Sequence, residues 1–571
     1  MATDHPRDEG SLMLRLAPVL IVILLVAPIL AGLTMALLPA FGYLPALGGE
    51  RLSLDPWRAL FAEPGIWRSA AISLASGLLA TAISLAVVLL FLAAASGSRL
   101  DRWIRRLVSP LLSIPHAAAA FGLAFLIAPS GLVARLASPG LTGWERPPDL
   151  LIVHDPWGLS LIAGLVIKEI PFLLLMSLAA LPQLDTERRV AMARSLGYRP
   201  TLAWWKVVAP SLYPLIRLPV FAVIAYASSV VDVAMILGPT LPPTLAVSIL
   251  TWFSDPDLET RFLASAGAIL QLGVTATALM IWWALERLVA RLMRGWVIRG
   301  GRRRGEASLH IAGKLWVVLV TVIAFAGIAG LAIHSVAGFW RFPDLLPTSA
   351  TLAHWARALP ALAGPIASTA LVAVASTLIA AALALAALEN EQRSGRHPSR
   401  ALWLLYLPLI VPQIAFLFGL VVVMEQLGTR PTHALVTFGH LLFVLPYVFL
   451  SLSEAYRRFD PRWSRLALTL GASRNGAFWR VRLPMLLAPI LTAVAVGLAV
   501  SIGQYLPTQL LAGGRVTTVT TEAVSLAAGN NRRVIGVWAL VQACLPLVGF
   551  IIAIGLPKLL WSNRRGMQGA P

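Results

Sequence analysis

Long apolar segments alternate with short polar segments along almost the whole chain, and this alternation sets the class of the protein. A membrane-spanning helix needs about 20 predominantly apolar residues. Segments of that length lie at 16–38, 69–96, 107–129, 158–182, 214–238, 265–290, 314–337, 364–389, 402–425, 433–455, 486–511 and 534–561. The pattern therefore predicts an all-α, polytopic membrane protein with about twelve spans.

Basic residues gather in the polar segments that follow the even-numbered spans. Arg99 to Arg106, Arg291 to Arg304 and Arg457 to Arg482 are the clearest examples. An excess of Lys and Arg marks the cytoplasmic side of a membrane protein. We therefore expect a multi-pass protein of the bacterial inner (plasma) membrane with both termini in the cytoplasm.

Composition agrees with this class and excludes others. The 571 residues are 58% hydrophobic and 13% charged, whereas a soluble domain is about a quarter charged. The net charge of +20 could indicate nucleic-acid binding, but the basic residues form separate clusters between spans. We expect contact with membrane lipid and no nucleic-acid partner.

Two residue types that often carry metal or redox chemistry are sparse within the apolar segments. The single cysteine, Cys544, excludes an intramolecular disulfide and a cysteine-based metal cluster. His116 and His440 lie in different spans without a second ligand at helical spacing. Hydrogen bonding to a neighbouring helix is the expected role of both histidines, and no metal site is predicted.

The second half of the chain repeats the first half in the same orientation. Aligning Gly197 with Gly471 also aligns Trp205 with Trp479, while SIPHAAAAFGLAFLI (113–127) corresponds to IVPQIAFLFGLVVVM (410–424). Matches in the same order indicate duplication. We predict one unit at 1–295 with a hairpin at 191–210, a basic cytoplasmic linker at 296–313, and a second unit at 314–571 with a hairpin at 465–484.

Each hairpin has the pattern of a helix, a turn, a short helix and a stop. Glycine tolerates the left-handed conformation that follows a helix C-terminus, and proline breaks a helix, so Pro210 and Pro484 are expected to end the short helix. That helix would lie across the membrane surface. It would present Leu196, Trp204 and Trp205 in one copy, and Leu470, Phe478 and Trp479 in the other.

Two interpretations of the hairpins remain open on these grounds alone. One is an interfacial amphipathic helix whose aromatic side chains lie at the lipid headgroups. The other is a pair of cytoplasmic knobs that bind a two-fold symmetric partner.

The repeated motif resembles the EAA loop of ABC-importer permeases. The sequence has A-x-x-x-G at Ala193 to Gly197 and at Ala467 to Gly471, and each glycine is followed thirteen residues later by proline. Nearly the whole chain is similar to a fused two-unit permease, most of all to the iron(III) and thiamine import class. The leading glutamate of the family motif is missing, since Ala191 and Arg465 occupy its position.

The resemblance implies that a coupling helix in each hairpin docks into an ATP-hydrolysing subunit. The residues it assigns to docking are Ala193, Leu196, Gly197, Trp204, Trp205, Pro210, Ala467, Leu470, Gly471, Phe478, Trp479 and Pro484. It also implies two copies of an ABC ATPase, and a soluble solute-binding protein at the opposite face.

The nucleotide chemistry is expected on the partner and not on this chain. A phosphate-binding G-x-x-x-x-G-K-[ST] loop is missing from the sequence, because the one Gly-Lys pair, Gly313-Lys314, is followed by Leu315. We therefore expect no catalytic residue and no cofactor here, with ATP and Mg on the partner subunit. The solute is not identified by the sequence.

Ionisable residues inside spans are the candidates for the solute pathway, because they are costly in lipid and often functional. Lys168 and Glu169 interrupt the fourth span, Asp232 lies in the fifth, and Gln504 lies in the eleventh. Asp232 and Gln504 are predicted to face the pathway. The structural alternative pairs Asp232 with Lys168 or makes it cap a backbone break near Gly238-Pro239. Lys168 and Glu169 serve either the interface between the halves or local helix solvation.

The ends of the fifth and eleventh spans are rich in glycine and proline, in DVAMILGPTLPPTLAVSI and PTQLLAGGRVTTVTTEAV. This composition predicts a broken helix and a re-entrant turn at the outer face. A gate below the binding protein and simple loop packing are equally open roles.

Two rival functions are weaker. A stand-alone secondary transporter with two parallel six-helix repeats would carry its strongest motifs nearer the second and third spans. An integral membrane enzyme would need a convergent set of His, Asp and Glu at a membrane face, and the sequence does not suggest one.

Overall fold

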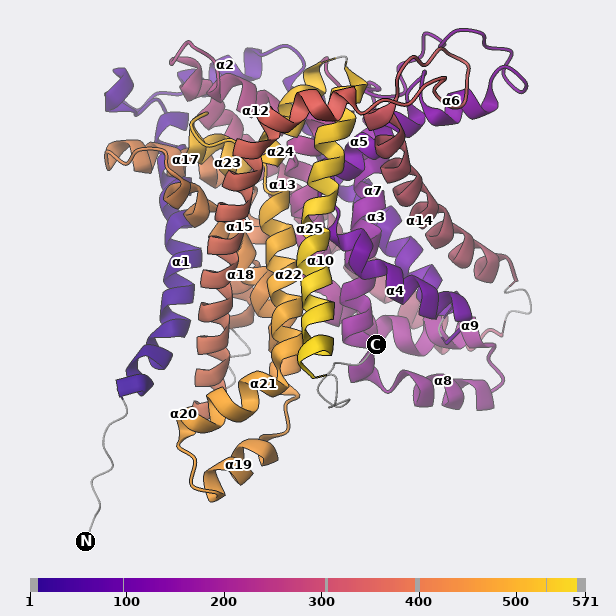
Figure 1. Ribbon diagram of the computed structural model, residues 1–571, viewed down its shortest axis with the longest axis vertical. Coiled ribbons are helices and arrows are strands. Elements are labelled where there is room, and N and C mark those ends of the chain that lie inside the picture. Colours follow the sequence, from indigo (N-terminus) through magenta and orange to yellow (C-terminus); the bar gives the residue numbers. More distant parts are fainter. Residues whose placement is uncertain (1–8, 96, 303–306, 396–400, 530, 562–571) are drawn as a thin grey trace.

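The computed structural model describes residues 9–95, 97–302, 307–395, 401–529 and 531–561, and every named element in these ranges is a helix (Figure 1). Ten helices in this part of the chain are long and apolar enough to cross a membrane, or twelve if each of two sharply bent helix pairs counts as one span. The prediction of an all-α polytopic protein is confirmed.

The helices of the two halves follow one another in the same order. The first half contains α1 (Glu9–Ala40), α2 (Asp55–Ala62), α3 (Ile66–Ala95), α4 (Arg99–Ser113), α5 (His116–Ile127), α6 (Leu132–Ala137), α7 (Leu159–Ala180), α10 (Ala209–Ser229), α11 (Asp232–Leu237), α12 (Leu245–Phe253) and α13 (Thr260–Ile298). The second half contains α14 (Ala307–Val336), α15 (Ala353–Ser394), α16 (Leu407–Ile410), α17 (Gln413–Gln426), α18 (His433–Arg457), α22 (Leu487–Gly503), α23 (Leu506–Ala512), α24 (Val519–Ser525) and α25 (Arg532–Leu560).

Equivalent hydrogen bonds in the two halves support the duplication. The Ser73 hydroxyl on α3 accepts the N–H of Leu245 at 3.1 Å, and the Thr369 hydroxyl on α15 accepts the N–H of Val519 at 2.9 Å. In both halves the bond joins the second long helix to the start of the short helix before the last span. This shared geometry fixes the register that relates α3 to α15.

The first helix of each half packs against the other half. Helix α1 lies against α15 and α17, while α14 lies against α3 and α5. In Figure 1 these two helices flank the bundle on opposite sides. Close contacts between glycines make both crossings possible, Gly32 with Gly419 and Gly122 with Gly327. Small residues allow such close approach between helix backbones in a membrane.

The fifth and eleventh spans are broken, as the sequence predicts. Helix α10 ends at Ser229 and α11 begins at Asp232, while α22 ends at Gly503 and α23 begins at Leu506. After each short helix the chain turns and enters another short helix, α12 or α24, before the final span of its half. The predicted helix breaks are therefore confirmed in both halves, while re-entry of the turns at the outer face stays a prediction.

The prediction that Pro210 ends a short helix is wrong. Residues Pro200–Ser229 form one membrane-span candidate, and Pro210 is the second residue of α10. Proline fits the first turn of a helix, because the N–H groups of that turn have no intrahelical acceptor and none is lost when proline lacks one. In the second copy the helix does bend, by 72°, between Arg474–Met485 and Leu487–Gly503, just after Pro484.

Candidate functional site

The two hairpins have the same turn. The first comprises α8 (Thr186–Ser195), α9 (Pro200–Ala203) and the π-helical segment η3 (Trp204–Val208). The second comprises α19 (Pro461–Thr469), α20 (Arg474–Ala477), the π-helical segment η5 (Phe478–Arg482) and α21 (Leu483–Met485). The two π-helical segments coincide when Gly197 is aligned with Gly471, so the repeat extends to an uncommon local geometry.

Glycine is required at both turns by the backbone. Gly197 has φ +85° and Gly471 has φ +86°, which is the left-handed region where a side chain is strained. In both copies the following N–H returns to a carbonyl of the preceding helix, from Tyr198 to Ala193 and from Ala472 to Ala467. These bonds close the C-terminus of α8 and of α19 and set the direction in which the chain leaves.

Both hairpins lie at one end of the molecule, at the bottom of Figure 1, opposite α2 and α6. Leu196 and Leu470 are 63% and 79% exposed. One turn earlier, Met192 and Leu466 are also exposed, at 55% and 52%. Because residues four apart share one face of a helix, α8 and α19 each present an exposed apolar pair at equivalent positions.

The aromatic residues of the hairpins divide into an inner and an outer member. Trp204 and Trp205 form an edge-to-face pair with ring centroids 5.7 Å apart, and Phe478 and Trp479 form the same arrangement at 5.1 Å. Trp204 is only 2% exposed, so its expected presentation at the surface is wrong: its ring packs into the helical core. Trp479 is 64% exposed, while Trp205 and Phe478 are half-buried.

The other residues assigned to docking are distributed between the surface and the core. Ala193 is buried, whereas Ala467 and Pro484 are half-buried and Pro210 is exposed. The sequence did not draw attention to Met192 and Leu466, although their spacing of four from Leu196 and Leu470 was available as a signal.

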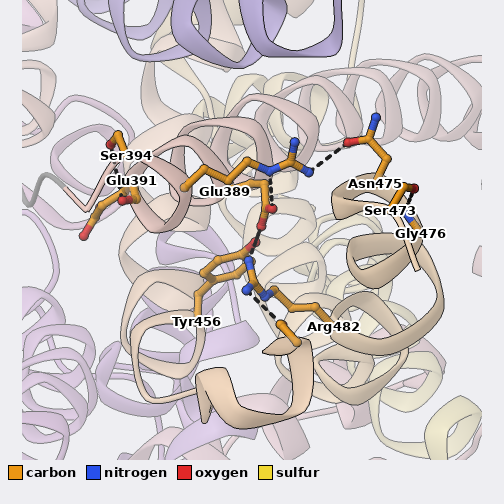
Figure 2. Close-up of polar contacts among 10 residues, drawn as sticks. Glu389, Glu391, Ser394, Tyr456, Ser473, Asn475, Gly476 and Arg482 are labelled. Carbon is orange, nitrogen blue, oxygen red and sulfur yellow. Dashed lines mark hydrogen bonds and ion pairs between the residues drawn. The ribbon is translucent and has the colours of Figure 1, made fainter. Parts of the chain in front are cut away.

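The second hairpin is held from behind by a buried ionic network, which Figure 2 shows. Glu389, near the end of α15, receives hydrogen bonds from Arg482 and Tyr456, and it pairs with Arg393 at 2.6 Å. Arg482 also donates to Ser464 of α19 at 3.0 Å, and Arg393 donates to Asn475 of α20 at 3.0 Å. The Glu389 carboxylate thus joins α15 to α18 and to η5 directly. It is joined to α19 through Arg482 and to α20 through Arg393.

A neighbouring ion pair strengthens the same end of the bundle. Glu391 of α15 and Arg457 of α18 make two contacts, at 2.8 and 3.0 Å. Such two-pronged pairs fix orientation as well as distance. The sequence analysis missed Glu389 and Glu391, because they lie where an apolar segment gives way to a basic loop and look like ordinary loop charges.

The first hairpin is held differently, by the C-terminal end of α13. Lys206 of η3 is buried, and its Nζ lies 4.8 Å from the ring centroids of both Tyr198 and Trp296. Its ammonium also reaches the Trp296 carbonyl at 3.4 Å, and the Tyr198 hydroxyl reaches the Gly300 carbonyl at 3.3 Å. The first hairpin is thus held by contacts of the Lys206 ammonium with aromatic faces, whereas the second hairpin is held by ion pairs.

The second set of candidates lies deeper, where the two halves meet. Lys168 of α7 is buried and donates to the carbonyls of Leu111, Leu112 and Ile114 at the end of α4. It satisfies carbonyls at a helix C-terminus, where a positive charge is favourable. The alternative in which Lys168 pairs with Asp232 is therefore wrong, and local helix solvation describes its contacts.

Glu169, the next residue on α7, points to a different neighbour. Its Oε1 lies 3.6 Å from Nε2 of His116 at the start of α5, and the His116 ring lies 4.8 Å from the ring of Tyr226 on α10. On the other half, Tyr447 of α18 faces Phe172 of α7 at 6.4 Å. These contacts put Glu169 at the boundary between the halves.

Asp232 and Gln504 both lie at the breaks of their spans. Asp232 is the first residue of α11 and is 7% exposed. It lies at the break before α11 and not beside Gly238-Pro239, so its capping of a backbone break there stays a prediction. Gln504 is half-buried at the end of α22, and its neighbour Tyr505 reaches Sδ of Met235 on α11 at 3.6 Å. The two breaks therefore meet across the interface.

His440 has the role expected of it. Its Nδ1 and Nε2 are each 2.8 Å from a hydroxyl, of Ser501 on α22 and of Thr508 on α23. The buried imidazole bridges the break between these two helices. Hydrogen bonding to neighbouring helices, predicted from the sequence, is confirmed for His440.

At the end of the molecule opposite the hairpins, a charged side chain holds the segment before α7. Asp155 accepts hydrogen bonds from the backbone N–H groups of Trp157, Leu159 and Ser160 and from the Ser160 hydroxyl. Burial opposes ionisation of this carboxyl, but the hydrogen bonds outweigh it and lower its pKa below the ordinary value. The same segment is joined to the end of α11, since His154 lies 2.7 Å from the Gly238 carbonyl.

Comparisons with known proteins identify the family. Residues 399–559 match the model of the binding-protein-dependent transport system inner membrane component. The chain is 32% identical over 524 residues to the inner membrane ABC transporter permease protein YnjC of Escherichia coli, covering 90% of this chain and 93% of that one. This chain belongs to the family of ABC-importer permeases.

Other permeases of the family match a single half. The putative 2-aminoethylphosphonate transport system permease protein PhnV of Salmonella typhimurium is 26% identical over 232 residues, which cover 40% of this chain and 86% of PhnV. The molybdenum transport system permease protein ModB of Mycobacterium tuberculosis is 28% identical over 179 residues, covering 28% and 68%. The permease is therefore a multi-pass inner-membrane protein similar over nearly its full length to a permease of double size.

Proposed function

We propose that this permease forms the whole transmembrane pathway of its importer and that its two hairpins each dock one ABC ATPase subunit. The observation that carries the proposal is the exposed apolar pair that α8 and α19 present at equivalent positions, Met192 with Leu196 and Leu466 with Leu470. Each pair projects beside a turn fixed by a left-handed glycine. Two such knobs on one face suit a partner with two-fold symmetry.

ATP and Mg would be bound by the partner, and a soluble binding protein would deliver the solute to the opposite face. Both termini would lie on the side of the hairpins, which is the cytoplasmic side by the distribution of basic residues. The pathway would run between the halves, past Glu169, Asp232 and Gln504. Lys168 would stabilise the break between α4 and α5 beside it.

Movement of the ATPase subunits would be transmitted through the contacts behind each hairpin. In the second half the route is the carboxylate of Glu389, which joins η5 to α15 and α18. In the first half it is Lys206, held against the end of α13. Rigid-body motion of one half against the other would then alternate access to the pathway.

Co-purification with the ATPase tests the docking. The permease and its ATPase subunit are co-expressed, and the complex is isolated through a tag on the permease. Leu196→Asp together with Leu470→Asp should remove most of the bound ATPase, because a charge replaces an exposed apolar contact. The matched control is Leu241→Asp, at an 85% exposed leucine outside the hairpins. Full retention of the ATPase by the double variant would contradict the proposal.

Transport by the permease alone distinguishes the rival function. Reconstituted in vesicles without an ATPase, the permease should move no solute, whereas a secondary transporter would show uptake driven by an ion gradient. The iron(III) or thiamine class stays a prediction beside the 2-aminoethylphosphonate and molybdenum systems of the relatives. A thermal-shift screen on the associated binding protein would identify the solute.

A further inference from the structure

Two acidic side chains lie at the interface between the halves, near a single histidine. Glu169 and Asp232 are 3% and 7% exposed. His116 lies beside Glu169 and its ring contacts that of Tyr226, while Tyr447 and Tyr505 lie within electrostatic range of Glu169 and Asp232, respectively. We call these six residues the interface acidic cluster; they come from five helices and from both halves, including the junction before α23.

Glu169 has an unsatisfied oxygen that is directed into this cluster. Its buried Oε1 makes no hydrogen bond within the described part of the chain. Nε2 of His116 lies 3.6 Å from this oxygen, beyond hydrogen-bonding distance. Lys168 is adjacent in sequence, but its ammonium is engaged by three carbonyls of the α4–α5 junction. A buried carboxylate without a partner is costly.

Asp232 supplies a second negative charge to the same volume. Its carboxylate lies within electrostatic reach of His116, Tyr226 and Tyr505. Asp232 is the first residue of α11 and lies in the first turn of that helix. Two carboxylates thus lie near one imidazole, whose side chain is 34% exposed.

The remaining walls of the cluster are aromatic. The Tyr226 ring lies against His116 at 4.8 Å, Tyr447 lies against Phe172 at 6.4 Å, and the Tyr505 hydroxyl contacts Met235. The described residues contain no group of three or more His, Cys, Asp or Glu side chains arranged to hold a metal ion. Carboxylates combined with aromatic faces are suited to an ammonium group, which the rings attract through their negative faces.

We propose that the interface acidic cluster is a binding subsite for an organic cation on the solute path, with Glu169 and Asp232 as its anionic groups. The inference rests on the proposed function only for the location of the solute path. The cation would offset the charge of Glu169 and contact the rings of Tyr226 and Tyr447. A solute that carries an ammonium group is the class that this subsite would favour.

Ligand-dependent thermal stability of the purified permease tests the subsite without any ATPase. Choline is compared with 3,3-dimethylbutan-1-ol, a neutral molecule of the same shape, and with KCl at the same ionic strength. Choline should raise the Tm by about 1 °C or more at tenfold its half-saturating concentration. The neutral alcohol and KCl should not. Equal shifts with all three, or no shift with choline, would overturn the proposal.

Variants test which residues are responsible for the rise in Tm with choline. Glu169→Gln and Asp232→Asn should each abolish the choline shift, and Tyr447→Leu should reduce it at least threefold. Glu169→Asp, which keeps the charge, is the second variant in case Glu169→Gln does not fold, and should retain part of the shift. Glu454→Gln, at a half-exposed ion pair with Arg458 on the cytoplasmic side, should leave it unchanged. A choline shift that survives Glu169→Gln would also overturn the proposal, whereas loss of ATPase co-purification would affect only the docking.

Discussion

Arg482 occupies in the second hairpin the position that Val208 occupies in the first. Its partner Glu389 corresponds to Ala93 in the register fixed by the equivalent hydrogen bonds of α3 and α15. Val208 is fully buried and Ala93 is 8% exposed, while Glu389 and Arg482 are buried as an ion pair. One copy is therefore anchored by apolar packing at this position and the other by buried charge.

Removal of one member of this ion pair should destabilise the permease strongly. Glu389→Gln leaves the buried Arg482 guanidinium without its carboxylate, which costs about 3–5 kcal/mol. Arg482→Leu should cost less, because Glu389 keeps Arg393 and Tyr456 as partners. The double variant Glu389→Ala with Arg482→Val reproduces the residues of the first half and should recover at least half of the lost Tm. Thermal unfolding in detergent, followed by tryptophan fluorescence, measures both. A single variant with an unchanged Tm would show that the pair contributes nothing.

The glycine contact between α5 and α14 should tolerate no side chain. A Cβ atom on Gly122 would lie 3.0 Å from the backbone of Gly327, so Gly122→Ala forces two helix backbones apart at a cost of about 1–3 kcal/mol. Gly364→Ala on α15 is the matched control, because no atom lies within 4 Å of its added Cβ and alanine favours a helix. Gly122→Ala should lower the Tm and Gly364→Ala should not. Equal values would contradict the packing described.

Lys168→Met should reduce stability, because it withdraws the donor from the carbonyls of Leu111, Leu112 and Ile114. Unsatisfied buried carbonyls cost about 1–3 kcal/mol. Lys558→Met, at an exposed lysine near the end of α25, is the control and should stay within about 0.5 kcal/mol. Urea or thermal unfolding compares the two. If Lys168→Met kept full stability but lost transport, Lys168 would act in the pathway instead.

Asp155 should make a stability contribution that disappears in acid. Its folded-state pKa is lowered, so the contribution is present above the unfolded pKa, about 3.9, and is lost as the pH falls through the folded value. Asp155→Asn should cost about 0.5–2 kcal/mol at pH 7, as loss of a helix cap does. The Tm difference from the parent should narrow below about pH 4. Asp149→Asn, at an exposed residue of the same outer segment, should show no difference at either pH.

Much of the fold follows from the sequence because lipid imposes simple rules. Span length, the basic segments between spans and the glycine at each hairpin turn depend on local composition, and the spans and turns are found where these predict them. The turns that follow α11 and α23 were also foreseeable from Gly238-Pro239 and Gly513-Gly514, whereas the breaks before these helices lie several residues earlier. The order of equivalent motifs was enough to indicate the duplication.

Contacts between distant segments were not foreseeable in the same way. The direction of the Trp204 side chain depends on the π-helical turn that η3 adopts, and hydrophobicity alone does not distinguish lipid from protein contact. Pro210 continues a helix because of its place in the first turn, which composition does not reveal. The pairing of Glu389 with Arg482 could have been found by comparing equivalent positions of the two halves. At two such positions the first half has the apolar residues Ala93 and Val208, and the second half has two opposite charges.

The packing of α1 and α14, each against the opposite half, has an evolutionary consequence. An ancestral single-length subunit with this packing would have covered much of its first helix by associating with a second copy, at a free-energy cost that rises on dilution. Joining the copies in one polypeptide removes that dependence and guarantees one of each half in every molecule. Because each fused molecule always contains one copy of each half, the two halves can diverge separately under selection. The difference between the contacts that hold the two hairpins is consistent with such divergence.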